Sequence, residues 1–252
     1  MTWQVLILAG SRGAEDPVAQ AAGVSHKAFA SIAGRPMISH VLAALKSADD
    51  INKIAVSIEK NAPPLPKGLT RLDAASSPAS SVLKASDTLK CPLLITTADN
   101  PLLSNETLTS FLDEAMKSDA DILAGVSTRD VVEKSERTGR RTYLKFSDHH
   151  VSGCNLFAVR TPKGLNAIHF WKSLENVRKS PWKMAQAIGP LSLLQYVFGL
   201  LRSGAAIEFI SKKTQCRGAL IFLDDPLAAH DVDKVEDLAF AEECLKSRKR
   251  AH

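Results

Sequence analysis

Glycines and cations follow the first apolar run of the chain. The segment Gly10-Ser11-Arg12-Gly13 comes directly after Val5–Ala9, and Lys27 comes further on, beyond small residues that predict a loose loop. Glycines let a backbone turn sharply and approach a ligand closely, so that its N–H groups can face an anion. Arginine offers a planar fork for phosphate oxygens, and lysine offers a point charge. The pattern predicts a polyphosphate site here, although a plain turn with surface cations has similar residues.

This first loop fits neither of the two common phosphate-binding motifs. No glycine is followed by Lys and Ser/Thr, as a P-loop requires. A dinucleotide fingerprint would need a third glycine and an immediate helix, and both are missing. Glu59, at the end of the second predicted strand, is the one residue that favours a dinucleotide site, and it does so weakly.

A carboxylate follows the most apolar strand of the sequence. Leu93–Thr97 reads as a buried strand, and Asp99 comes just after it, ahead of the turn at Pro101. Ligands of open α/β sheets bind at the carboxyl ends of strands, where Asp99 would be placed to hold Mg²⁺ on phosphates. The alternative is that Asp99 merely caps the turn, a task that Asn100 could also perform.

A second acidic segment lies near the C-terminus. In an extended strand, Asp231 and Asp233 would point to the same face, and one of them could be a second carboxylate for the same metal. Acidic residues ahead of a helix are also ordinary caps, and Glu236 and Asp237 fit that role.

These segments must be held together by a folded domain, and the pattern of the first half of the chain predicts its architecture. Strand-like runs alternate with helical patterns, which predicts a mostly parallel sheet with helices on both faces. The predicted strands are Val5–Ala9, Ile54–Ile58, Leu93–Thr97 and Asp121–Val126, and the predicted helices are Met37–Ser47, Ser80–Leu89 and Thr107–Met116.

The pattern is less regular after Val126. We expect one domain over residues 1–252, with a helical insertion at about 164–203. The later predicted strands are Thr142–Phe146, Asn155–Val159, Ile207–Ile210 and Leu220–Leu223, and a last helix is predicted over Lys234–Lys246.

Composition excludes several classes of protein. The 252 residues are 45% hydrophobic and carry a formal charge of +5, which suits a globular domain with a polyanionic substrate or simply a basic surface. Basic residues are scattered and no nucleic-acid motif is present. The four cysteines lack zinc-ligand spacing, the histidines show no triad, and no transmembrane segment or signal peptide is recognisable. These features lead us to expect a cytoplasmic protein.

Taken in order, the motifs resemble a known family. ILAGSRG, a lysine, IAGRPMI, a strand ending in TADNPLL, SGCNLF and HDVDKVEDL are similar to segments of the nucleotidyltransferases with a glycosyltransferase-A-like fold. These include the molybdenum-cofactor guanylyltransferase, the methylerythritol-phosphate cytidylyltransferase and the CMP-sugar synthetases. The resemblance covers most of the chain and is weakest from Gly164 to Lys213. It implies a single-domain, three-layer α/β/α, Rossmann-like fold with a mixed, mostly parallel sheet.

The resemblance also implies an activity: Mg²⁺-dependent transfer of NMP from an NTP, CTP or GTP above all, to a small phosphorylated acceptor, with release of pyrophosphate. Catalytic roles would fall to Arg12, Lys27 and Asp99. Metal ligands would be Asp99 and Asp233, with Asp231 as the alternative second ligand. Gly153 and Asn155 would frame the acceptor. The nucleotide would contact Leu8, Ala9, Gly10, Ser11, Arg12, Gly13, Lys27, Ser80, Ser81 and Ala98.

Two other functions stay open at this stage. An A-type glycosyltransferase would bind a nucleotide-sugar, but its usual Asp-x-Asp is missing around Asp99. A non-catalytic nucleotide-binding protein would keep the fold without turnover. The stretch Trp182–Arg202 is more apolar than one face of a short helix needs, which predicts a buried helix, a homodimer interface or a lid.

Overall fold

A mixed sheet forms the centre of the molecule. The computed structural model describes residues 2–11, 15–135, 142–175 and 189–250. The strand order is β10-β7-β9-β6-β1-β4-β5, with β8 paired to β9. Strand β9 runs antiparallel to its neighbours, and the other pairs in the order are parallel. The strands of this sheet are β1 (Trp3–Leu8), β4 (Ile51–Ile58), β5 (Thr70–Asp73), β6 (Leu93–Thr97), β7 (Ile122–Thr128), β8 (Leu144–Lys145), β9 (His150–Val159) and β10 (Gly218–Phe222).

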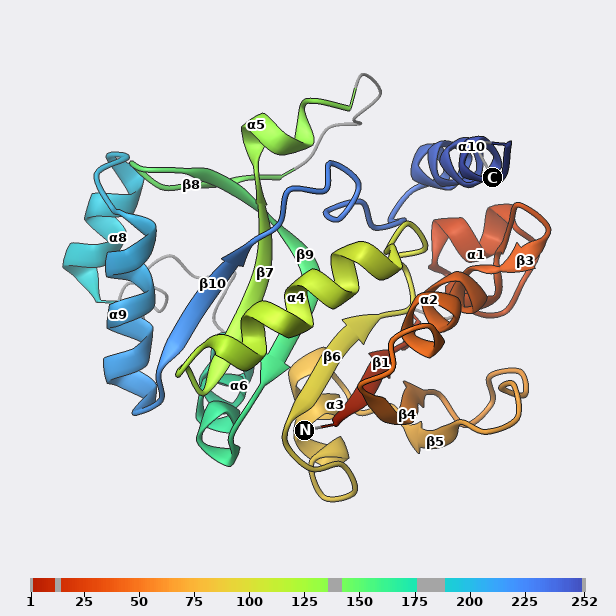
Figure 1. Cartoon of the computed structure of the whole chain (residues 1–252), viewed down its shortest axis with the longest axis horizontal. Coiled ribbons are helices and arrows are strands. Elements are labelled where there is room, and N and C mark those ends of the chain that lie inside the picture. Colours follow the sequence, from red (N-terminus) through yellow and green to blue (C-terminus); the bar gives the residue numbers. More distant parts are fainter. Residues whose placement is uncertain (1, 12–14, 136–141, 176–188, 251–252) are drawn as a thin grey trace.

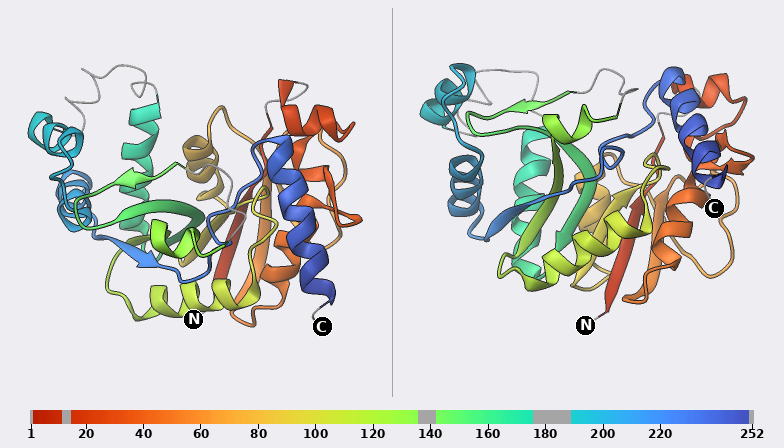
Figure 2. Two further views of the ribbon diagram at one scale, coloured as in Figure 1. Left: turned by 90° about the horizontal axis from the view of Figure 1, so that it is seen from above. Right: turned by 45° about the horizontal axis from the view of Figure 1, so that its top comes forward.

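Helices cover both faces of the sheet, as the sequence predicts (Figures 1 and 2). On one face lie α2 (Met37–Lys46) and α4 (Asn105–Lys117), whose apolar residues, Phe111 among them, pack on β1, β6 and β7. On the other face lie α3 (Pro78–Ala85) and α6 (Leu165–Glu175), which pack on β1 and β6 through residues such as Val82. The three-layer α/β/α prediction is therefore confirmed.

A smaller core forms where the two ends of the chain meet. Helix α1 (Pro17–Ala21) lies beside α10 (Val235–Arg250) (Figure 1). Val18, Leu102 and Val232 belong to one buried apolar cluster here. The prediction of a loose loop between Gly13 and Lys27 is thus partly wrong, because α1 lies within it. Asp16 caps α1, because its carboxylate accepts hydrogen bonds from the N–H groups of Val18 and Ala19, and such caps favour helix initiation. A 3₁₀ turn, η2 (Lys27–Phe29), and a hairpin of β2 (Ser31–Ile32) and β3 (Arg35–Pro36) follow.

The later part of the chain contains the clearest error of sequence-based prediction. Ile207–Ile210 lies inside α9 (Ser203–Thr214) and is not a strand. A short apolar run does not distinguish a strand from a helix. Here Asp148 fixes the start of the helix by accepting hydrogen bonds from the N–H and hydroxyl of Ser203. The helical segment therefore extends past the expected boundary at 203.

The other helices are short. Helix α8 (Pro190–Val197) falls within the predicted helical stretch, whereas α5 (Arg129–Val132) and the turn η3 (Pro162–Gly164) were not predicted. Residues 176–188, which contain Trp182, lie outside the described part of the chain. Within the described part, no helix has the length and hydropathy needed to cross a membrane.

Candidate active site

The lysine of the first loop joins two acidic segments that are far apart in sequence. Lys27 Nζ lies 2.6 Å from Asp99 Oδ2 and 3.2 Å from Asp233 Oδ1. It also donates to the carbonyl oxygen of Val232, at 2.9 Å. The three segments meet because β6 delivers Asp99 to the carboxyl edge of the sheet, while η2 and the segment before α10 pass over that edge. The predicted cluster of Lys27, Asp99 and Asp233 is therefore present in the structure.

The two carboxylates stabilise the charged form of Lys27. Burial acts to lower the pKa of Lys27, but the carboxylates of Asp99 and Asp233 outweigh burial, and the net effect raises that pKa above its ordinary value. Lys27 therefore keeps its positive charge throughout the neutral range. A fixed, half-buried cation next to two carboxylates is suited to hold phosphate oxygens and a metal ion together.

Neither Asp99 nor Asn100 caps the turn that follows β6. Asp99 Oδ2 is bound to Lys27, and Asp99 Oδ1 is buried without a hydrogen-bond partner among the described residues. The Asn100 amide donates to the carbonyls of Cys154 and Ala228, away from the turn. A buried carboxylate oxygen with no partner is costly unless a ligand satisfies it. This arrangement fits a divalent cation, because carboxylate oxygens are the ligands that Mg²⁺ prefers.

Asp231 faces a different partner. The Asn155 amide nitrogen lies 3.5 Å from Asp231 Oδ2, so this carboxylate is turned toward β9, whereas Asp233 is turned toward Lys27. Asn155 has a positive φ of 52°, in a part of β9 where the pairing with β7 is irregular. Asparagine tolerates this conformation better than most residues, and a bulge here re-aims the side chain. Gly153 lies two residues earlier on the same strand, opposite Val126.

The loop after β1 sits between two neighbouring strand ends. Ala9 N–H donates to the carbonyl of Ser57 on β4, and Ala98 N–H donates to that of Leu8, which places Leu8, Ala9 and Ala98 side by side. At Gly10 a Cβ atom would lie 3.4 Å from Glu59 Oε1, in van der Waals contact with that carboxylate. Arg12 and Gly13, to which the sequence assigns phosphate contacts, lie outside the described residues.

Glu59 is a part of this site whose role the sequence reasoning missed. Glu59 Oε1 accepts a 2.9 Å hydrogen bond from Ser11 N–H, and Glu59 Oε2 lies 3.6 Å from His26 Nε2. Arg71 on β5 braces the turn behind Glu59 by donating to the carbonyls of Glu59, Lys60 and Ala62. The signal was the carboxylate at a strand end, and the structure shows it bound to the backbone of the loop after β1.

A cavity of about 430 Å³ opens beside this carboxylate. It is lined by α1 and the segment after it, by Ser11, and by Glu59 and Asn61 at the end of β4. His26 lines the cavity while its neighbour Lys27 reaches the acidic cluster. Helix α1 and residues 23–26 thus form a pocket wall next to the loop after β1.

The two serines assigned to the nucleotide lie at the start of α3. Ser77 caps this helix by accepting from the N–H of Ser80. Ser81 is buried, and its hydroxyl accepts from the N–H of Ala75. Ser81 therefore shapes the loop before α3, and Ser80 is the more accessible of the pair.

Comparison with known proteins agrees with this architecture. The sequence model of the MobA-like NTP transferase domain matches residues 5–170. A hypothetical transferase from Thermus thermophilus is 24% identical, with a TM-score of 0.81 over 94% of this chain and all of that one. The 2-C-methyl-D-erythritol 4-phosphate cytidylyltransferase from Thermus thermophilus is 16% identical, with a TM-score of 0.57 over 98% of this chain and all of that one.

A third solved structure is CMP:2-keto-3-deoxy-manno-octonic acid synthetase in complex with CTP. It is 11% identical, with a TM-score of 0.59 over 98% of this chain and all of that one. No curated protein sequence matches the chain. At these identities the structural likeness shows the fold.

The fold and the family match together define the class of this protein: it is a nucleotidyltransferase. More particularly, the chain belongs to the MobA-like NTP transferase domain family, whose match covers most of its length.

Proposed function

We propose that this protein transfers NMP from an NTP to a small phosphorylated acceptor, in a reaction that depends on Mg²⁺ and releases pyrophosphate. The observation that carries the proposal is the contact of one ammonium group, Lys27 Nζ, with both Asp99 and Asp233. Solved nucleotidyltransferases that share the fold, one of them in complex with CTP, support a nucleoside triphosphate as the donor.

The chemistry requires little from the protein beyond positioning and charge. An oxygen of the acceptor phosphate attacks the α-phosphorus, and the bond from that phosphorus to the oxygen of the β-phosphate breaks. The acceptor oxygen is already anionic, so no general base is needed. Lys27 is placed to stabilise the charge on the phosphate oxygens as the leaving group departs.

The residues present fit a magnesium ion. Asp99 would hold it through the oxygen that has no other partner, and Asp233 would be the second ligand, with Asp231 as the alternative. When bound, Mg²⁺ supplies charge neutralisation on the phosphates. One or two carboxylates together with substrate phosphates are the usual environment of this ion. Asp231 is less suited to the role, because its carboxylate is turned toward Asn155, whereas that of Asp233 lies beside Lys27, which also contacts Asp99.

The direct test is pyrophosphate release, measured with CTP, GTP, UTP and ATP and a panel of sugar and alditol phosphates. Asp99→Ala should lower the rate by at least about 100-fold, because it removes the carboxylate that contacts Lys27 and would bind the proposed metal ion. Asp113→Ala is the matched control, because Asp113 is exposed on α4 and should leave the rate unchanged.

Turnover by Asp99→Ala at the wild-type rate would contradict the role given to Asp99. The glycosyltransferase alternative predicts a different result, in which NDP-sugars stabilise the protein against heat more than free NTPs do. A non-catalytic protein would bind an NTP and release no pyrophosphate with any acceptor.

A further inference from the structure

Asn100 is a buried residue whose side chain links three segments of the proposed site. Its side chain is only 1% exposed, and it follows Asp99 directly. The amide nitrogen lies 3.1 Å from the carbonyl oxygen of Cys154 and 3.5 Å from that of Ala228. Cys154 precedes Asn155 on β9, and Ala228 belongs to the segment that leads to Asp231 and Asp233. One amide therefore connects the end of β6, the bulge of β9 and the acidic segment.

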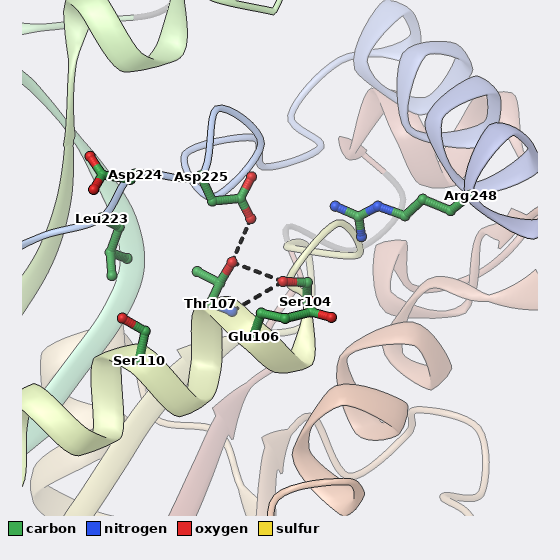
Figure 3. A pocket seen from close by; sticks show the side chains of 8 residues that line it. All are labelled: Ser104, Glu106, Thr107, Ser110, Leu223, Asp224, Asp225 and Arg248. Carbon is green, nitrogen blue, oxygen red and sulfur yellow. Dashed lines mark hydrogen bonds between the residues drawn. The ribbon is translucent and has the colours of Figure 1, made fainter. Parts of the chain in front are cut away.

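The acidic segment has no regular structure of its own. Residues 223–234 run between β10 and α10, and the position of Asp233 depends on what holds them. Near the start, Thr107 on α4 donates to Asp225 at 2.5 Å (Figure 3). Near the end, Val232 N–H donates to the carbonyl of Asp99 at 2.8 Å. Asn100 holds the middle of the segment, between these two attachments.

The start of the same segment borders open space. A cavity of about 510 Å³ lies there, lined by the first turn of α4, by Leu223–Asp225 and by Arg248 of α10 (Figure 3). In Figure 3 the Arg248 side chain extends toward this space from the α10 side, and its guanidinium donates to the carbonyl of Leu102. Further along, Ala228 and Val232 are buried. The hydrogen bond from Asn100 to Ala228 lies in that buried part, where the loss of a donor is costly.

We infer that Asn100 is a positioning residue for this reaction: it sets the distance between Asp99 and Asp233 and holds Asn155 beside them. The inference rests on the proposed function. A buried primary amide can donate two hydrogen bonds at once, and without it two buried carbonyls lose a donor. Asp225 would keep its bond to Thr107, but the segment after Ala228 would gain freedom. The bond from Val232 N–H to Asp99 would then open more often, and Asp233 would leave its place beside Lys27 more often.

Asn100→Ala should show this in two measurements. In hydrogen–deuterium exchange of the protein without metal or nucleotide, the amide of Val232 should exchange at least about tenfold faster, because that N–H reports directly on the bond to Asp99. In pyrophosphate release, the Mg²⁺ concentration for half-maximal rate should rise at least about fivefold and kcat should fall, with KM for the NTP changed less than twofold.

Thr161→Val is the matched control. It removes the hydrogen bond from Thr161 to the buried Asp121, at the opposite edge of the sheet. This control should leave Val232 exchange and the Mg²⁺ dependence unchanged. Asn100→Ser, which keeps one donor, should fold even where the alanine variant does not. Its Val232 exchange rate and its Mg²⁺ concentration for half-maximal rate should lie between those of the wild type and Asn100→Ala.

The inference is overturned by unchanged Val232 exchange in Asn100→Ala or Asn100→Ser. It is also overturned if exchange rises equally throughout the sheet, or if Thr161→Val has the same effect. Failure of the proposed function is a separate result, since a wild-type protein without pyrophosphate release would still reveal through exchange whether Asn100 holds the acidic segment.

Discussion

At the scale of the residue, the central feature is a lysine shared by two carboxylates. Lys27 is only partly accessible, and its contacts with Asp99 and Asp233 raise its pKa despite the opposing effect of burial. Its charge is therefore constant near neutral pH and lies between the two carboxylates. Sequence alone identified these three residues but gave no distances, because contacts between segments 72 and 206 positions apart depend on how the chain folds.

Lys27→Met should reduce kcat by roughly 100- to 1,000-fold, because one preorganised electrostatic contact to a developing charge is worth that much. Lys27→Arg should retain more of the rate, since arginine keeps the positive charge on a guanidinium group of different shape. Steady-state pyrophosphate release measures both.

The matched control is Lys60→Met. Lys60 is 83% exposed and pairs with Asp73 at 3.4 Å, so solvent screens the pair and the rate should not change. If Lys27→Met turned over within threefold of the wild type, the role given to this lysine would be wrong.

At the scale of the element, the carboxyl ends of the parallel strands determine which residues of the site lie close together. The alternation of apolar runs and helical patterns predicted β1, β4, β6 and β7, and with β6 the edge at which Asp99 emerges. Strand β5 was not predicted. The wall built by α1 was not predicted, because five residues of helix leave little periodicity in a sequence and Asp16 resembles any loop carboxylate. The part played by Glu59 was also missed, because it depends on β1 and β4 being neighbours.

Glu59→Ala should weaken the binding of CTP or GTP about tenfold, because Ser11 N–H loses its acceptor and the loop after β1 is no longer held by that hydrogen bond. That change corresponds to about 1.4 kcal/mol, within the range for one lost buried hydrogen bond. Glu59→Gln keeps an acceptor oxygen and should bind nearly as the wild type does. Isothermal titration provides the dissociation constants.

Glu133→Ala is the control for the loss of a glutamate. Glu133 is exposed and pairs with Arg129 on α5, away from the loop after β1. Equal nucleotide affinity of Glu59→Ala and the wild type would show that Glu59 does not brace the loop.

At the scale of the whole molecule, an apolar surface on and just after α8 is the main departure from the buried helix that the sequence favoured. Leu194 is 54% exposed and Phe198 is 68% exposed, with Leu191, Val197 and Leu200 exposed as well. Leu201, in contrast, is buried. Apolar content predicts burial but cannot tell which helix lies at the periphery. Self-association and a lid remain hypotheses for this surface.

Leu194→Asp should change the free energy of unfolding by less than about 0.5 kcal/mol, because an exposed side chain loses little on substitution. Urea denaturation measures this value. Leu112→Ala, at a buried position of α4, should cost about 2–5 kcal/mol in the same assay.

A large loss of stability in Leu194→Asp would mean that α8 is buried after all. Sedimentation velocity of the same variant separates the remaining hypotheses. A homodimer through α8 predicts that the wild type sediments faster than the variant at high protein concentration, whereas a lid predicts equal rates.

The measurement that most directly tests the central claim follows the α-phosphorus of the nucleotide. The protein is incubated with Mg²⁺, an NTP labelled at the α-phosphorus, and the panel of sugar and alditol phosphates. The lysine–carboxylate cluster predicts that the label moves to an acceptor and that the released pyrophosphate carries none of it. A label that stays in the NTP with every acceptor, while titration shows that the NTP is bound, would contradict nucleotidyl transfer by this site.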